Sequence, residues 1–317
     1  MSCARDTVPS SNPMSSSVHE GHRSVLLHEA ITALALTPGD TVLDATLGGA
    51  GHALAIAQAL GPRGHLVGLD ADGEAIERAQ ERLQDVSCEV TLIEANFKDA
   101  TRELSQHGIT AINSALFDLG WSSYHLSAGR GFSFREVTDP LLMTYEKDPG
   151  EDALTAKIIL NTWESESIAD ILWGWGEERF SRRIARAIVE RRTEAPLETV
   201  GDLVSVVESA VPAWYRRGRI HPATKTFQAL RIATNGELQA AETGITAARD
   251  LLVPGGRLAV ITFHSIEDRL IKQMFKRWEG EGHGTICARI KPTPEESKEN
   301  PRARSALLRT FEKHHDE

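Results

Sequence analysis

The stretch from residue 41 to residue 120 alternates apolar runs with helical patterns, and this alternation constrains the fold more than any other feature. Apolar runs typical of strands occupy 41–44, 64–70, 89–97 and 109–118, and an Ala/Leu/Ile helix ending at Gly61 follows the first of them. Strands that alternate with helices form parallel sheets with right-handed crossovers. We therefore expect an α/β fold with a doubly wound, Rossmann-like sheet.

In an open sheet of this kind, ligands bind at the carboxyl ends of the strands. Four residues fall at those ends: Asp44, Asp70, Phe97 and Asp118. Asp118 also begins a turn, "DLGWSS", so turn formation is the alternative role for its carboxylate.

The alternation stops after about residue 136, where helical patterns take over. Sheet-like patterns return with a long helix over 224–252, a strand near 257–263 and one or two late strands. We expect three units: a disordered tail at 1–20, a sheet domain at 21–136 and 221–317, and an inserted, all-helical substrate-recognition domain at 137–220.

Composition narrows the class of protein. The chain has 317 residues, a net charge of −10 and three widely spaced cysteines, which favour neither disulfides nor a thiolate metal site. We predict a cytoplasmic protein without a metal, and the true start is either Met1 or Met14. Two basic runs, 179–192 and 216–225, stand out in this acidic chain and form a local nucleic-acid footprint, with solvated helix faces as the alternative.

The glycine-rich turn "DATLGGAGH" over 44–52 lets the backbone approach a ligand at a helix start. Asp70 lies 22 residues after Gly48, a spacing that suits an acid bound to ribose hydroxyls. Asp44 would repel a pyrophosphate but suits the amino group of a methionine moiety, which favours S-adenosylmethionine over NAD. Phe97 would flank the adenine; loop capping for Asp44, a turn donor for His52 and core packing for Phe97 are the alternatives.

Eight ordered blocks resemble one family, the small-subunit ribosomal RNA cytosine-N4 methyltransferase H family. They are "HRSVLLHEA", "GGAGH", "DLGWSS", "RGFSF", "GEERFSRRIARAIVERR", "HPATKTFQALRIATNGEL", "GGRLAVITFHSIEDRLIK" and "ENPRARSALLR", between about residues 22 and 310. The resemblance implies a class I methyltransferase with an inserted helical domain and S-adenosylmethionine as methyl donor. It implies one cytidine in the decoding region of bacterial small-subunit (16S) rRNA as target.

The resemblance also implies cofactor contacts, and two departures qualify it. Where the family has Pro-Gln after its Ser-Ser, this chain has Tyr124 and His125, and where it has an Asp and an Arg, this chain has Leu142 and Thr144 in "DPLLMTY". The implied contacts are Ala50, Gly51, His52, Asp70, Phe97, Asp118 and His125, to which the turn adds Asp44 and Gly48.

Methyl transfer to a cytosine amine needs positioning and an acceptor for an amine proton. We hypothesise that Asp118 supplies that acceptor and that Trp121 stacks on the unstacked base, with packing beneath the turn as its alternative. The candidate substrate contacts, each with a structural role as its alternative, are His221, Lys225, Gln228, Arg231, His264, Ser265, Arg302 and Arg304.

Three other functions stay open from the residues alone. A DNA amino-methyltransferase usually carries an Asp/Asn-Pro-Pro-aromatic block, which "DLGW" is not. A catalytically altered family member acting as an RNA-binding assembly factor is the second, and an NAD-dependent oxidoreductase is the third. Because basic residues are confined to patches, we expect small-subunit rRNA within an assembled or nearly assembled 30S particle rather than naked rRNA as the partner, with no membrane and no obligate protein partner.

Overall fold

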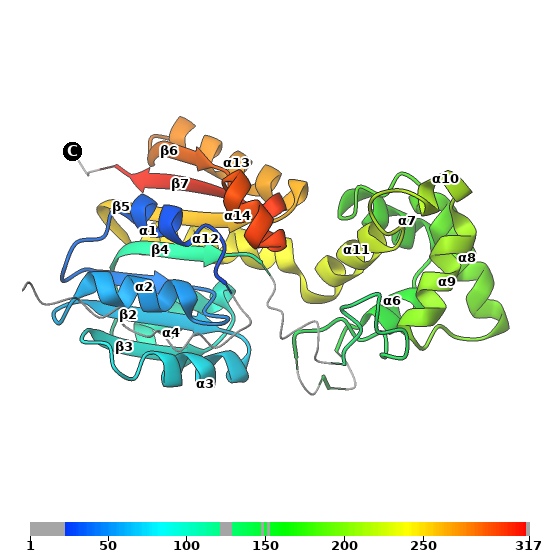
Figure 1. Cartoon of the computed structure of the whole chain (residues 1–317), viewed down its shortest axis with the longest axis horizontal. Helices are drawn as coiled ribbons and strands as arrows, with labels where there is room; N and C mark the ends of the chain where they lie inside the picture. Colours follow the sequence, from blue (N-terminus) through cyan, green and yellow to red (C-terminus); the bar gives the residue numbers. More distant parts are fainter. Residues whose placement is uncertain (1–22, 121–128, 147–148, 151–152, 315–317) are drawn as a thin grey trace, which may run out of the picture.

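The computed structural model describes residues 23–120, 129–146, 149–150 and 153–314. The predicted tail at 1–20, Trp121 and His125 lie outside these described residues. The described chain forms a sheet flanked by helices and a separate group of helices beside it (Figure 1).

The sheet has seven strands, and the predicted doubly wound architecture is confirmed. β1 to β5 pair in parallel, whereas β7 runs antiparallel to both β5 and β6, so the sheet is mixed at one edge. The order across the sheet is β3 (Glu89–Glu94), β2 (His65–Asp70), β1 (Thr41–Asp44), β4 (Ile112–Asp118), β5 (Leu252–Thr262), β7 (Leu307–Lys313) and β6 (Gly284–Ile290).

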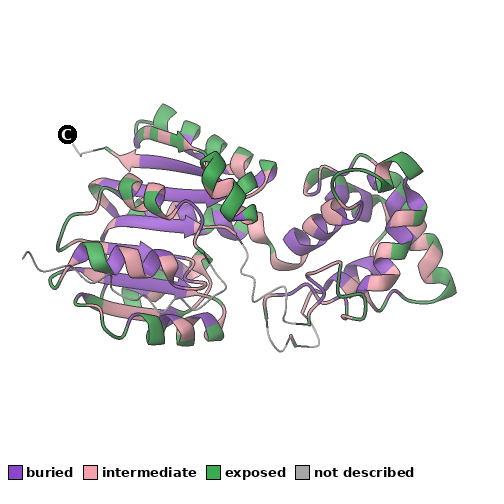
Figure 2. Ribbon diagram, viewed as in Figure 1, coloured by how far each residue is buried: buried purple, intermediate pink, exposed green. Residues whose placement is uncertain are grey.

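Two apolar layers cover the two faces of the sheet, because successive strand residues point to opposite sides. Val42 packs with one layer and Leu43 with the other. The central strands are largely buried between the helices, whereas the edge strands β3 and β6 are mostly intermediate or exposed (Figure 2). The first layer uses α1 (Leu27–Leu34), α2 (Gly51–Leu60) and α3 (Gly73–Arg82), and the second uses α4 (Ala100–Gln106), α12 (Glu237–Leu251) and α13 (Ser265–Gly280). Short elements complete this part: η1 (Phe97–Asp99), α14 (Pro294–Glu299) and η2 (Pro301–Ser305).

The remaining helices share a third apolar cluster of their own, which runs from Phe132 to Ala233. We call this group the helical body, and it lies beside the sheet in Figure 1. It contains α6 (Ala156–Thr162), α7 (Ser165–Gly174), α8 (Ser181–Glu194), α9 (Val200–Ala210), α10 (Ala213–Arg216) and α11 (Thr224–Asn235). The domain boundaries at 137 and 220 stay predictions.

The expected single helix over 224–252 is wrong, because Gly236 divides it into α11 and α12. Gly236 adopts a left-handed conformation with a φ of 59° and ends α11. Glycine reaches that conformation without the steric cost other residues incur, so it commonly terminates helices. As a result α11 belongs to the helical body, whereas α12 packs on the sheet.

Candidate active site

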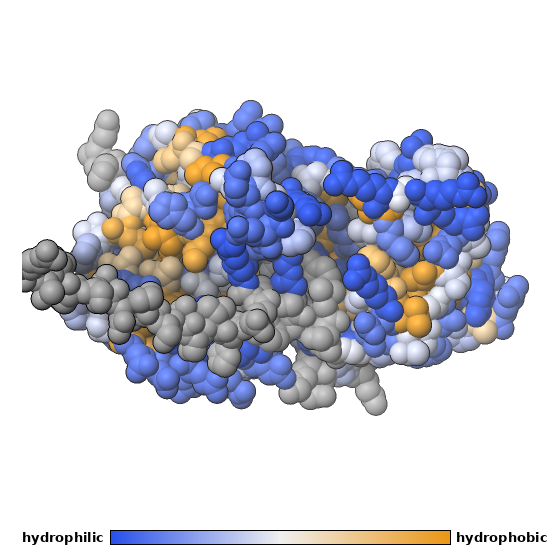
Figure 3. Space-filling model, in the orientation of Figure 1, coloured by the Kyte–Doolittle hydropathy of each residue, from blue (hydrophilic) through white to orange (hydrophobic). Residues whose placement is uncertain are grey.

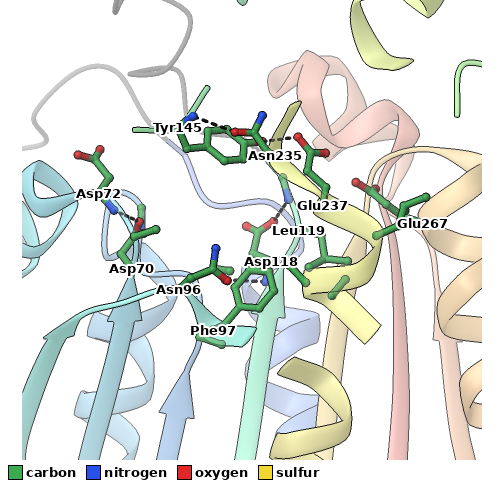
Figure 4. Close-up of a pocket in the computed structure, with 18 residues that line it drawn as sticks. Asp70, Asp72, Asn96, Phe97, Asp118, Leu119, Tyr145, Asn235, Glu237 and Glu267 are labelled. Atoms are coloured by element: carbon green, nitrogen blue, oxygen red, sulfur yellow. Dashed lines mark hydrogen bonds between the residues drawn. The ribbon is translucent and has the colours of Figure 1, made fainter. Parts of the chain in front are cut away.

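A cleft opens at the carboxyl ends of the strands, where the sequence predicted a ligand site. We call it the strand-end cleft, and Figure 4 shows its polar residues, with Asp70 and Asp118 at the ends of their strands. It is lined by Ala45, Thr46, Gly48, Asp70, Ala71, Asp72, Asn96, Phe97, Asp118, Leu119, Gly120, Tyr145, Asn235, Glu237, Leu238, Ala240, Ala241 and Glu267.

The glycine-rich turn is tied directly to the end of β2. Asp70 Oδ2 accepts a hydrogen bond of 2.8 Å from the Gly48 amide, and Oδ1 accepts one of 2.9 Å from the Asp72 amide. Burial raises the pKa of Asp70 despite these two donors. Each carboxylate oxygen can accept a second hydrogen bond, so Asp70 can hold the turn and still bind a hydroxyl group.

Phe97 forms another wall of the cleft. Its ring meets Phe117 edge-on, with 5.7 Å between ring centroids, and packs so closely on Gly244 that a Cβ there would lie 2.6 Å from the ring. The ring is therefore held in a fixed position: it packs on the core, as expected, and lines the cleft, whereas its contact with an adenine stays a prediction.

Asp44 is buried and does not line the cleft. Its Oδ1 accepts a hydrogen bond of 3.1 Å from the Thr46 amide, but its Oδ2 has no hydrogen-bond partner. Burial raises its pKa to about 6. A buried carboxylate oxygen without a partner is costly, and a nearby cation would offset that cost.

Asp118 lies at the end of β4, with its backbone amide donating to Thr46 Oγ1 at 2.7 Å. Its Oδ1 accepts a hydrogen bond of 3.1 Å from the Gly120 amide, which confirms the turn role, and its Oδ2 lies 3.7 Å from His52 Nδ1. Burial and the nearby carboxylate of Glu267 raise its pKa to about 7. Asp118 therefore takes both protonation states near neutral pH.

His52 lies behind Asp118 and is itself buried, at 5% exposure. Its Nε2 is 3.0 Å from the carbonyl oxygen of Val25, an acceptor, so Nε2 carries the proton and Nδ1 faces Asp118. Burial lowers the pKa of His52, which favours the neutral ring. Ala50 and Gly51 support this turn: Ala50 has a φ of 54°, and a Cβ on Gly51 would lie 2.0 Å from Ser24 Oγ.

A second and more open space adjoins the cleft, and we call it the α11 cavity. Its volume is about 600 Å³, against about 140 Å³ for the strand-end cleft, and the two share Leu119, Gly120 and Glu267. It brings together four of the predicted substrate contacts, Gln228, Arg231, His264 and Arg302. The apolar side chains around them are Leu119, Phe132, Phe134, Met143, Ile220, Phe227 and Phe263.

The other four predicted substrate contacts do not line this cavity. Their side chains contact the protein: His221 stacks on Phe134 with centroids 4.4 Å apart, and Lys225 Nζ donates to the carbonyl oxygen of Glu177. Ser265 Oγ donates to the Glu177 carboxylate, and Arg304 Nε donates to the Ser297 carbonyl oxygen. Even Gln228, inside the cavity, donates to a backbone carbonyl, that of Trp175.

Three residues that the sequence did not single out join the cleft to the cavity. Tyr145 donates its hydroxyl proton to Glu237 Oε1 at 2.8 Å, and Glu237 also accepts two hydrogen bonds, of 2.8 and 2.9 Å, from Arg231. The Tyr145 amide in turn donates to Asn235 Oδ1 (Figure 4). Because Tyr145 is 90 residues from Asn235 and 92 from Glu237, no local pattern predicts its contact with them.

In the altered segment "DPLLMTY", uncharged residues stand at positions 142 and 144. Thr144 is buried, and its Oγ1 accepts a hydrogen bond of 3.2 Å from the Glu146 amide. Neither Leu142 nor Thr144 lines the strand-end cleft or the α11 cavity.

The sheet and the acidic cleft at its strand ends define a class I methyltransferase, with β7 as the antiparallel strand. The chain belongs to the MraW methylase family, whose model matches residues 19–314.

Two curated relatives are both called ribosomal RNA small subunit methyltransferase H. The one from Symbiobacterium thermophilum is 42% identical over 310 residues, covering 92% of this chain and 96% of its own. The one from Dictyoglomus thermophilum is 42% identical over 293 residues, with the same coverage. Family membership supports S-adenosylmethionine as the cofactor.

Among solved structures, an rRNA methylase from Streptococcus thermophilus aligns with a TM-score of 0.43 and 11% identity. The alignment covers 92% of this chain and 98% of that one. The assignment rests on the sequence family and the sheet, not on this low score.

The described residues hold no group of three or more His, Cys, Asp or Glu side chains placed to bind a metal ion. They also contain no helix long and apolar enough to cross a membrane.

Proposed function

We propose that the protein transfers a methyl group from S-adenosylmethionine to the N4 amine of one cytidine in the decoding region of small-subunit rRNA. Family membership and the names of its relatives support the reaction class and the RNA. The single observation that carries the chemistry is the position of Asp118. It lines the strand-end cleft, and the next two residues, Leu119 and Gly120, line both the cleft and the α11 cavity.

The strand-end cleft fits the donor. Gly48, Asp70 and Phe97 offer the backbone approach, the hydroxyl acceptor and the aromatic wall that an adenosyl group needs. Asp44 Oδ2, buried and without a partner, supplies negative charge beneath the turn for the cationic methionine end. The bound donor supplies an electrophilic methyl group attached to a sulfonium.

The α11 cavity fits the acceptor base. Its apolar side chains suit the flat face of a cytosine, while Arg302 offers positive charge to a phosphate or polar edge. A base entering it would come from unpaired RNA, because a stacked base cannot reach a pocket of this kind.

Asp118 accepts a proton of the N4 amine in the proposed reaction. The N4 lone pair forms the new N–C bond, the S–C bond breaks with its electron pair passing to sulfur, and the N4 proton passes to Asp118 Oδ2. The Gly120 amide already donates to Oδ1, so Oδ2 has the larger remaining capacity to accept a proton. Negative charge beside the amine stabilises the positive charge that develops on nitrogen.

Transfer of tritiated methyl from S-adenosylmethionine to small-subunit particles, naked rRNA and DNA tests this function, followed by mass spectrometry of the labelled nucleoside. We expect N4-methylcytidine from the particles, and fastest there. Labelling of DNA alone, or at another atom of the base, would contradict the proposal.

An inactive RNA-binding assembly factor is the second candidate, motivated by Leu142 and Thr144. Absence of label on every substrate, with RNA binding intact, would favour it. Against it, the Thr144 hydroxyl is hydrogen-bonded to the Glu146 amide and lines neither pocket, although its neighbours Met143 and Tyr145 line the cavity and the cleft.

A further inference from the structure

An exposed cluster of aromatic rings with an arginine stacked on it lies at the start of α8 and on α10. The guanidinium of Arg179 lies over two rings, 5.3 Å from the centroid of Phe180 and 5.2 Å from that of Trp214. Tyr215 packs edge-on against both rings. Trp214 is nevertheless 58% exposed, an unusual state for the largest apolar side chain. We call these four residues the Trp214 patch.

The Trp214 patch is held in place from below by one buried carboxylate. Glu178, with no exposed surface, accepts a hydrogen bond of 2.8 Å from the Phe180 amide and one of 2.7 Å from the Tyr215 hydroxyl. The rings are therefore pre-arranged, so a ligand that stacks on them does not have to order them.

Exposed arginines of the two basic runs flank the patch along the chain. Arg191 and Arg192 donate to backbone carbonyls, and Arg186 Nε donates to the carbonyl oxygen of Arg182. Apart from Arg191 and Arg192, the arginines of these runs are exposed and form no ion pair with a described residue, while Arg179 stacks on its two rings. The surface around α10 is largely hydrophilic in Figure 3. These exposed arginines are Arg179, Arg182, Arg183, Arg186, Arg216, Arg217 and Arg219.

The patch connects along the chain to the α11 cavity. Ile220 lines that cavity and follows Trp214 by six residues, so the two are at most about 20 Å apart. Three of the exposed arginines, at 216, 217 and 219, lie on this path.

We propose that the Trp214 patch binds unpaired RNA next to the target cytidine, with a base stacked on Trp214 and phosphates on the neighbouring arginines. Aromatic rings interleaved with cations are the usual platform for single-stranded nucleic acid, whereas an acidic peptide would need no exposed ring. This inference rests on the proposed function and adds a second RNA contact outside the reactive pocket.

The test is fluorescence anisotropy with a labelled single-stranded RNA of about 15 nucleotides, centred on a cytidine, in the full chain. Trp214→Ala should weaken binding about tenfold, since stacking on one aromatic ring contributes about 1–3 kcal/mol per base. Trp173→Ala is the matched control, because Trp173 is 64% exposed on α7 and stacks on no described ring or arginine. It should bind as the wild type does.

Changing Arg216 and Arg217 together to Gln should reduce the slope of log K against log salt by about 1.4, for two lost phosphate contacts on a single strand. Equal affinity of the Trp214→Ala and Trp173→Ala variants, or equal competition by a polyglutamate peptide, would overturn the inference.

Methyl transfer separates this inference from the proposed function. Trp214→Ala should raise the KM for RNA and leave kcat at saturating RNA within about twofold, with unchanged cofactor binding. A wild-type protein that transfers no methyl group refutes the proposed function. An active protein whose KM for RNA is unchanged by Trp214→Ala refutes RNA binding at the Trp214 patch.

Discussion

Asp118→Asn isolates the proposed chemistry at the point where the cleft and the cavity meet. In the variant, the amide oxygen can still accept from the Gly120 amide, which leaves the NH₂ group where Oδ2 stood, 3.7 Å from His52 Nδ1. A donor then faces the N4 amine in place of an acceptor. Loss of one such electrostatic contact costs about 10²- to 10³-fold in kcat, so we expect a decrease in that range.

The pH dependence gives the same prediction a second readout. Because the pKa of Asp118 is about 7, ionised Asp118 should limit kcat/KM below that pH, with a decrease of about tenfold per pH unit. The Asn variant should lack this dependence. Initial rates of methyl transfer between about pH 5.5 and 8.5 measure both, and an Asn variant with near wild-type kcat and an unchanged profile would refute the catalytic role.

A stability measurement separates loss of chemistry from loss of fold. The pKa of Asp118 is raised by folding, so its ionisation destabilises the folded wild type as pH rises from about 4 through about 7. The Asn variant avoids that cost, on the order of 4 kcal/mol at most, and should unfold at higher urea concentration than the wild type at pH 8. Asp72→Asn is the matched control: it changes another acid lining the cleft and should keep the pH dependence near 7.

Three further predictions concern the cleft and its walls. The affinity for S-adenosylmethionine, measured by calorimetry, should rise up to about tenfold between pH 6 and pH 8, because the positive charge of this ligand favours ionised Asp44 and Asp118. S-adenosylhomocysteine, which lacks the sulfonium charge, should show a smaller rise. Tyr145→Phe should lower the free energy of unfolding by about 0.5–1.5 kcal/mol in urea, since Glu237 keeps its bonds to Arg231, and a loss above 3 kcal/mol would contradict this arrangement. Gly48→Ala should raise the KM for the cofactor, because Gly48 lines the cleft in a left-handed conformation with a φ of 50°, which alanine adopts at a steric cost. Gly108→Ala is the control: Gly108 has a φ of 75° and equally open surroundings but does not line the cleft, so this KM should not change.

The sequence predicted the parts of the site that depend on local order. Parallel strands end at one edge, so Asp70, Phe97 and Asp118 could be assigned to a common cleft before any contact was known. Asp44 also falls at a strand end but does not line the cleft, whereas Ala45 and Thr46, which follow it, do.

Contacts between distant segments could not be predicted in this way. An arginine of a basic run either donates hydrogen bonds to the end of another helix or remains exposed, and neighbours many residues away decide which. Arg192 is an example, since it donates to the carbonyl oxygens of Leu160 and Trp163. The break at Gly236 was also ambiguous, since a glycine inside a helical pattern either costs about 1 kcal/mol or ends the helix.

That break explains how two apolar bodies share one site. Arg231 and Asn235 lie on α11, which packs in the helical body, and Glu237 begins α12, which packs on the sheet. Gly236 turns the chain between them, so the ion pair of Arg231 and Glu237 closes across the turn within six residues. Glu237 lines the strand-end cleft and Arg231 lines the α11 cavity, so the ion pair that borders both spaces also joins the two bodies. The short, hydrogen-bonded link between the two spaces therefore runs through one residue of each body.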